Sequence, residues 1–155
     1  MPVREREVVN RQEGGWGGYI ERNPRLAAEN ETLKLTRKLW AEIERVNARV
    51  NRRRWTPEQG DHWDHSLPDD CENFALNKRR ALGRKGIPLG ALRVVTGRVK
   101  LKGKWIDHAM LCLVTDRGDY LLDNLTDDIE PWEEREFRPL LRTAGGNRQQ
   151  IVGRR

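Results

Sequence analysis

The spacing of apolar residues predicts two helices in the first half of the chain. The pair Asn23-Pro24 is a favourable helix start, since Asn can cap a helix and Pro fits the first helical position. Apolar residues then recur at three-, four- and seven-residue steps, which predicts an amphipathic helix over residues 25–51. A second helix is expected over residues 71–83. The apolar positions of the two helices are Leu33, Trp40, Ile43, Val46 and Val50, then Phe74, Ala75, Ala81 and Leu82.

The second half of the chain is predicted to form strands. Residues 92–101 are rich in β-branched side chains, and residues 105–115 alternate small and large apolar side chains. A tight turn over residues 116–119 then leads into a third strand over residues 120–123. These segments predict an antiparallel meander.

Three segments lack this periodicity. Residues 1–23 are rich in Arg and Gly, and we expect them to form a basic arm. Residues 52–70 are rich in turn formers and are expected to form a loop that carries two tryptophans. Residues 143–155 are polar, Gly-containing and basic, which is typical of a mobile tail. The expected domain therefore spans residues 24–142.

Length and charge narrow the class of protein. A chain of 155 residues fits one domain, and 30 Lys and Arg against 24 Asp and Glu give a net charge of +6. With 35% charged residues and no apolar run near 18 residues, we expect no membrane span. The N-terminus lacks the apolar core of a signal peptide, so we expect the protein to be cytoplasmic at synthesis.

A candidate nucleophile, Cys71, stands in the first turn of the second predicted helix. Backbone N–H groups and the helix dipole favour an anion there and lower a thiol pKa below its free value of about 8.5. Asp70 and Glu72 act in the opposite direction, because negative neighbours raise the thiol pKa unless a cation or metal offsets them. The polar, Asp-rich turn argues against a buried structural cysteine. The other cysteine, Cys112, lies mid-strand among apolar residues and is expected in the core.

A base and an orienting carboxylate are available in the predicted sheet. His108 lies at the head of an apolar strand, where packing gives no reason for a histidine, and Asp123 ends the next strand. The head and tail of adjacent antiparallel strands lie at the same end of a sheet, so Cys71, His108 and Asp123 could converge as a Cys-His-Asp triad. A two-residue Arg117-Gly118 loop would instead place Asp123 opposite Cys112, roughly 13 Å short of His108. A bulge at Gly118 or a differently closed turn would shift that pairing.

Three short motifs follow one another along the chain. They are Asp70-Cys71-Glu72-Asn73-Phe74-Ala75, Asp107-His108-Ala109-Met110-Leu111 and Leu121-Leu122-Asp123-Asn124-Leu125. In this order and spacing they resemble the bacterial transglutaminase-like cysteine proteinases, a family that includes the periplasmic protease that releases biofilm adhesins. The resemblance covers about residues 40–132.

The resemblance implies an α+β fold with a papain-like, transglutaminase-like core, in which the nucleophile helix packs on an antiparallel sheet. It also implies hydrolysis of peptide bonds in a protein or peptide substrate through a thioester. Carried over residue by residue, it implies that Cys71 is the nucleophile, His108 the general base and acid, and Asp123 the orienting carboxylate. The backbone N–H of Cys71 would supply one oxyanion-hole donor, and the indole N–H of Trp63 is a weaker candidate for the second.

The resemblance also implies a calcium site beside the nucleophile. In the adhesin-releasing members, acidic residues on either side of the cysteine bind calcium, and Asp70 and Glu72 match those positions. A bound cation would offset the negative charge next to the thiol. Asn73 departs from the family, which usually has a second acidic residue there.

Other function classes stay open at this point. Basic clusters at residues 52–54, 78–80 and 98–104 could form a nucleic-acid-binding surface with stacking tryptophans, although no recognised nucleic-acid motif organises them. The same thiol pocket could serve acyl transfer to an amine, or belong to a pseudoenzyme used as a scaffold. A basic chain without an export signal would also suit a phage-associated protein released at lysis. The sequence leaves the oligomeric state open.

Overall fold

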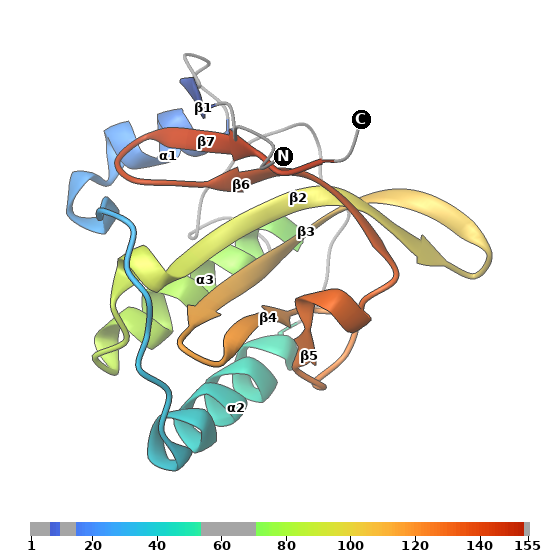
Figure 1. Cartoon of the computed structure of the whole chain (residues 1–155), viewed down its shortest axis with the longest axis horizontal. Coiled ribbons are helices and arrows are strands. Elements are labelled where there is room, and N and C mark those ends of the chain that lie inside the picture. Colours follow the sequence, from blue (N-terminus) through green and yellow to red (C-terminus); the bar gives the residue numbers. More distant parts are fainter. Residues whose placement is uncertain (1–6, 10–14, 54–70, 154–155) are drawn as a thin grey trace.

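The structure, a computed structural model, describes residues 7–9, 15–53 and 71–153 (Figure 1). The α-helices in these ranges are α1 (Gly15–Arg22), α2 (Arg37–Asn51) and α3 (Cys71–Arg84), and the short 3-10 helices are η1 (Pro24–Leu26), η2 (Leu89–Ala91) and η3 (Trp132–Glu134). The strands are β1 (Glu7–Val9), β2 (Leu92–Leu101), β3 (Lys104–Thr115), β4 (Gly118–Leu122), β5 (Glu130–Pro131), β6 (Phe137–Thr143) and β7 (Arg148–Ile151).

These strands form one sheet in the order β1-β7-β6-β2-β3-β4-β5, and every neighbouring pair is antiparallel. The long β2–β3 hairpin lies at its centre, and β4 follows β3 directly. Helix α3 lies across β3 and β2, α2 packs on α3, and α1 lies beside β7 (Figure 1). The predicted meander and the α+β class are therefore confirmed.

Alternate residues of β3 serve two cores on opposite faces of the sheet. Leu111 and Leu113 join a large cluster that includes the buried side chains of α1, α2 and α3. Met110 and Cys112 join a smaller cluster, against which Trp132 packs. Because both faces are covered, β3 is apolar at nearly every position in its second half.

Helix α2 begins later than the apolar spacing predicts. Its N-cap is Thr36, whose hydroxyl oxygen accepts a hydrogen bond from Leu39 N at 3.2 Å. Leu33, further upstream, forms an isolated parallel bridge with Thr115 and is 5% exposed. The helix start predicted at residue 25 is wrong, because Leu33 joins the core from a bridge to β3 rather than from a helix face.

Residues 15–22 form a helix that is packed into the core. Trp16 and Tyr19 lie on one helix face, are each 1% exposed, and stack with their ring centroids 5.6 Å apart. The Trp16 indole N–H donates to Gly146 O at 3.2 Å, and the Arg79 guanidinium lies 4.9 Å from the Trp16 ring. The predicted basic arm is therefore wrong for residues 15–22, since two large aromatic side chains anchor them. Residues 10–14 and 1–6 lie outside the described residues.

The C-terminal segment also belongs to the sheet. Strand β7 pairs with β6 on one side and with β1 on the other. The hydroxyl oxygen of Thr143 accepts a hydrogen bond from Val94 N at 2.9 Å. Residues 143–153 therefore differ from the predicted mobile tail, because the sheet uses their backbone hydrogen-bonding groups.

Helix α3 carries two buried cations, Lys78 and Arg79. Arg79 donates to three backbone carbonyl groups, which satisfies its guanidinium inside the protein. Lys78 is 1% exposed. Burial lowers the pKa of Lys78 to about 7, although the negative charges of Asp123 and Asp127 act to raise it.

Because Trp16 is buried, removing its side chain should destabilise the folded protein. Trp16→Ala should lower the free energy of unfolding by about 3–5 kcal/mol, the usual range for truncating a core aromatic side chain. Urea denaturation followed by circular dichroism measures the change. Trp105, half-buried in the β2–β3 hairpin, is the matched control, and Trp105→Ala should cost less. Equal costs for the two variants would contradict a core position for Trp16.

Because Lys78 is buried, the stability of the folded protein should depend on pH. The folded lysine titrates near 7 and the unfolded one near 10.5, so the unfolded chain holds more protons between these values and wild-type stability rises with pH there. Lys78→Met lacks this slope. At and below about pH 7, Lys78→Met should therefore be more stable than the wild type by a few kcal/mol, the order of magnitude that a pKa shift of this size represents. This advantage should disappear toward pH 10.

Thermal unfolding across this pH range measures the difference between wild type and Lys78→Met. Lys85→Met replaces an exposed lysine just beyond the same helix and serves as the control. Parallel pH curves for the wild type and Lys78→Met would contradict the proposed effect of burial.

Candidate active site

The turn between β3 and β4 sets the register of the two strands. Thr115 pairs with Gly118, so the loop consists of Asp116-Arg117 rather than the predicted Arg117-Gly118. The Thr115 hydroxyl donates to Gly118 O at 2.7 Å, and Gly118 has a φ of 106°, which glycine adopts without strain. The pairing is therefore shifted by two residues from the one first expected.

This register brings the two predicted polar residues toward each other. Leu111 pairs with Leu122, so continuing the ladder places Asp123 opposite Met110. His108 is two positions further along β3, about 7 Å away along the strand. The gap predicted from an Arg117-Gly118 loop is wrong, and the remaining distance is short enough for the side chains to close.

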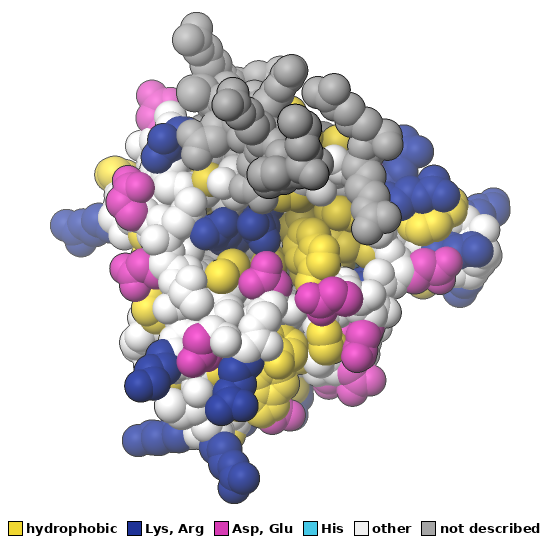
Figure 2. Space-filling model, viewed as in Figure 1, with side chains coloured by type: hydrophobic (Ala, Val, Ile, Leu, Met, Phe, Trp, Pro, Cys, Tyr) yellow, Lys and Arg dark blue, Asp and Glu magenta, His cyan; other side chains and the backbone are white. Residues whose placement is uncertain are grey.

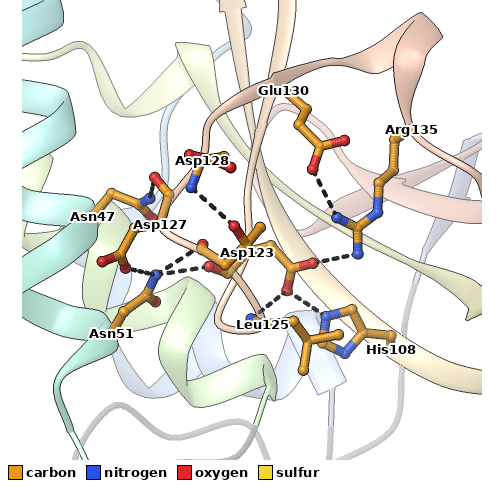
Figure 3. A network of polar contacts seen from close by, with 10 residues as sticks. Asn47, Asn51, His108, Asp123, Leu125, Asp127, Asp128, Glu130 and Arg135 are labelled. Carbon is orange, nitrogen blue, oxygen red and sulfur yellow. Dashed lines mark hydrogen bonds and ion pairs between the residues drawn. The ribbon is translucent and has the colours of Figure 1, made fainter. Parts of the chain in front are cut away.

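His108 and Asp123 form a buried hydrogen-bonded pair. His108 Nε2 lies 2.6 Å from Asp123 Oδ1, and the two side chains are 4% and 2% exposed (Figure 3). A carboxylate can only accept, so Nε2 carries the proton in this contact. In the neutral ring Nδ1 is then the basic nitrogen.

The Asp123 carboxylate is held in its ionised form. Burial alone would raise the pKa of this carboxyl. The hydrogen bond and charge of His108, the charge of Arg135 and the Leu125 N–H together hold the pKa below its ordinary value. Asp123 therefore keeps its negative charge at neutral pH and can orient an imidazole.

The end of α2 fixes the loop that follows Asp123. Asn51 Nδ2 donates to Asp123 O at 2.9 Å, to Thr126 O at 3.1 Å and to Asp127 Oδ1 at 2.9 Å. One turn earlier, Asn47 Nδ2 donates to Asp127 O at 3.1 Å (Figure 3). Two amides on one helix face thus hold the backbone on which the carboxylate stands.

Cys71 is the first residue of α3, the helix that packs against β3. Its side chain is half-buried and contacts the large core cluster. Its thiol donates to Glu72 Oε2 at 3.2 Å. Among the polar contacts of the described residues, none joins the Cys71 sulfur to the His108 ring. The structure therefore brings His108 and Asp123 together, and it places Cys71 on the helix packed against the strand of His108.

Asp70 and Trp63 are the remaining predicted site residues, whereas Cys112 was expected in the core. Asp70 and Trp63 lie outside the described residues, so the second oxyanion donor and the second calcium ligand stay predictions. Cys112 is fully buried in the core, as expected. Burial raises the pKa of the Cys112 thiol to about 12, which makes it a poor nucleophile at neutral pH.

Two groups of site residues were missed in the sequence. Arg135 donates to Asp123 Oδ2 at 2.7 Å, but it sits in a run of charged residues that resembles a solvated surface. Asn47 and Asn51 gave a usable signal, because they lie one turn apart beside the apolar stripe of α2.

A metal centre needs several ligands close together, and a membrane span needs a long apolar helix. Across 7–9, 15–53 and 71–153, no three His, Cys, Asp or Glu side chains gather in a way that could hold a metal ion. None of the described helices is both long and apolar enough to cross a bilayer.

Comparison with solved structures gives the fold independently. LapG of Legionella pneumophila in its calcium-bound form has a TM-score of 0.63 and 20% identity, covering 88% of this chain and 76% of that one. An EGTA-treated LapG structure has a TM-score of 0.61 and 21% identity, covering 88% and 74%. A third LapG structure has a TM-score of 0.59 and 21% identity, covering 88% and 76%. At these identities the likeness shows a shared fold.

Comparison of sequences gives the family. No curated protein sequence matches this chain. The family model described as bacterial transglutaminase-like cysteine proteinase matches residues 15–153, which include all three motifs that carry the resemblance. The chain therefore belongs to the bacterial transglutaminase-like cysteine proteinases.

Proposed function

We propose that this cysteine protease hydrolyses peptide bonds with Cys71 as nucleophile, His108 as general base and acid, and Asp123 as orienting carboxylate. The observation that carries the proposal is the buried hydrogen bond between Asp123 and His108, which lies on β3, the strand against which the Cys71 helix packs. The Nε2 contact leaves Nδ1 as the nitrogen that can accept a proton from sulfur. Catalysis requires the thiol to turn from Glu72 toward that nitrogen.

The reaction then follows from these roles. His108 Nδ1 takes the thiol proton, and the sulfur attacks the scissile carbonyl carbon to form a tetrahedral oxyanion. Collapse of this intermediate breaks the C–N bond, and His108 gives its proton to the leaving amine. A water molecule, deprotonated by His108, next attacks the thioester. Release of the carboxylic acid returns the proton to the sulfur.

The oxyanion would be stabilised at the start of α3. The first N–H groups of a helix have no partner within the helix, so the Cys71 N–H can donate to the developing negative charge. The indole N–H of Trp63 is the second donor in this proposal. The helix dipole favours the same anion.

We also propose that Glu72 and Asp70 hold a calcium ion, by analogy with the calcium-bound form of LapG. A carboxylate is a suitable hard ligand, and the described residues supply the one at Glu72. In the absence of a cation, Glu72 Oε2 accepts the thiol hydrogen of Cys71 at 3.2 Å. This contact favours the thiol over the thiolate, because the thiolate and the carboxylate would repel each other. A bound calcium ion would supply positive charge that offsets the Glu72 carboxylate.

The nucleic-acid alternative finds no support on the face in view. Figure 2 shows Lys and Arg side chains over the start of α2 and at the tip of the β2–β3 hairpin, with Asp and Glu between them. Some basic residues of the described chain are paired with acids, such as Arg98 with Asp107 at 3.3 Å. Mixed charge of this kind favours solubility over phosphate binding.

The triad makes the first functional prediction. Cleavage of a peptide library, read by mass spectrometry, should fall on the order of 10⁴-fold or more in Cys71→Ala and His108→Gln. Asp123→Asn should cost on the order of 10²- to 10⁴-fold, because the imidazole loses its orienting acceptor. Iodoacetamide at neutral pH should label Cys71.

Cys112→Ala is the matched control, because it removes the other thiol of the chain. It should keep both the peptidase activity and the iodoacetamide labelling. Cleavage that survives Cys71→Ala would refute the proposed nucleophile. Adding hydroxylamine to the wild-type reaction separates hydrolysis from acyl transfer, since a transferase would form the hydroxamate in preference to the acid.

The calcium proposal makes a second prediction. EGTA should slow both cleavage and the alkylation of Cys71 by iodoacetamide, and added CaCl₂ should restore both. Calcium should also raise the unfolding temperature of the wild type, since a ligand that binds the native state stabilises it. Glu72→Gln should lose the thermal shift and alkylate Cys71 at a rate independent of EGTA. Glu44→Gln, on an exposed acid of α2, is the control, and an unaltered calcium response in Glu72→Gln would reject Glu72 as a ligand.

A further inference from the structure

The two oxygens of the Asp123 carboxylate have separate donors. Oδ1 accepts from His108 Nε2 at 2.6 Å and from Leu125 N at 3.2 Å. Oδ2 accepts from Arg135 Nη2 at 2.7 Å (Figure 3). The side chain is 2% exposed, so solvent offers little replacement for any of these donors. Loss of the Arg135 contact would leave a buried, charged oxygen without its described partner.

Arg135 is itself held in place for this contact. Its second terminal nitrogen, Nη1, donates to Glu130 Oε1 at 3.2 Å, so the guanidinium bridges two carboxylates. Arg135 directly follows the short helix η3 and closes its end. Trp132 of that helix packs edge-on against Phe137 with ring centroids 5.4 Å apart. The arginine side chain is 15% exposed, and its fork geometry loses little freedom on binding.

We propose that Arg135 is a positioning residue for the catalytic centre, holding Asp123 ionised and rotated so that Oδ1 faces His108. This inference rests on the proposed function of His108 and Asp123. Arg135 acts through Asp123 and contacts neither His108 nor Cys71 in the described structure. Arg135 has two effects on Asp123. Its positive charge favours the ionised carboxylate, and the geometry of its hydrogen bond fixes the rotation of that carboxylate.

The positive charge of Arg135 affects the protonation of Asp123. Groups facing Asp123 come from several elements: His108 from β3, Lys78 from α3, and Arg135 after η3, with Glu130 of β5 and Asp127 nearby. Burial raises the pKa of the Asp123 carboxyl, while His108 and then Arg135 lower it. Without the Arg135 charge, Asp123 would take up a proton at a higher pH. A protonated carboxyl no longer orients an imidazolium ion.

The test compares Arg135→Met with Arg135→Lys and with the control Arg138→Met. Arg138 is exposed, lies three residues further along and stacks on Trp105 at 3.9 Å, away from Asp123. In Arg135→Met, kcat for a library-derived peptide should fall by up to about 100-fold with little change in KM, since the imidazole is misplaced but substrate contacts are intact. The acid side of its pH profile should move to higher pH. Arg135→Lys keeps the positive charge, so it should have the wild-type pH profile on the acid side but recover only part of kcat. Arg138→Met should match the wild type in both kcat and pH profile.

A second measurement does not depend on activity. The side-chain carboxyl carbon of Asp123, followed by NMR in a Cys71→Ser background, should titrate at higher pH when Arg135→Met is added. An unchanged Asp123 titration together with an unchanged pH profile would overturn the role of Arg135, even if the triad is correct. Peptidase activity that persists in Cys71→Ser would instead refute the proposed function, while the Asp123 titration still decides whether Arg135 controls that carboxylate. Circular dichroism confirms that each variant is folded, and a loss of kcat that only tracks unfolding would also count against the proposal.

Discussion

The negative charge buried at Asp123 is the constraint on which this end of the molecule depends. A carboxylate removed from water is strongly disfavoured unless charged or N–H donors replace its hydration. Here those donors come from a strand, a turn and the end of a short helix, and Asn51 holds the backbone of the same residue from α2. Elements distant in sequence must therefore keep one relative position. The orientation of the His108 imidazole is a consequence of satisfying that charge.

The same requirement explains why the helix layer contains polar groups that a core built only for stability would exclude. Lys78 is buried on the inner side of α3 with a pKa brought down to about 7, and the amides of Asn47 and Asn51 face the loop after β4. Apolar residues of similar size would generally stabilise such positions. Polar groups concentrated at one place against local packing rules are typical of a functional site.

The sequence predicted the elements whose signals are local. The helix from Cys71 and the strands at 92–101 and 105–115 follow from periodicity, and the structure has them within one residue at every end. His108 became a candidate because a histidine on an apolar strand has no packing role. The strand register was missed, because it depends on Thr115 closing the turn to Gly118, and neighbouring residues offered an equally reasonable loop.

Features that depend on tertiary contacts were missed for a different reason. Arg135 lies among charged residues on both sides, and only the folded chain reveals that its guanidinium reaches a buried carboxylate. The helix at residues 15–22 is glycine-rich and has a weak propensity, so its existence depends on packing Trp16 and Tyr19 into the core. The motifs therefore indicated the proposed site, whereas the groups that surround it could be identified only from the fold.

In the proposed mechanism, the proton of Cys71 has two acceptors with opposite consequences. Transfer to His108 produces the thiolate, whereas the hydrogen bond to Glu72 at 3.2 Å retains the thiol. The helix N-terminus favours the thiolate in either case, so the charge at Glu72 decides how strongly the thiol form is retained. A cation at Glu72 and the Arg135 contact at Asp123 act on different partners of one proton transfer. The cation acts on the donor, Cys71, and Arg135 acts through Asp123 on the acceptor, His108. Because these two groups stand on separate elements, α3 and the segment after η3, the readiness of the sulfur and that of the imidazole can be set independently, and hydrolysis needs both.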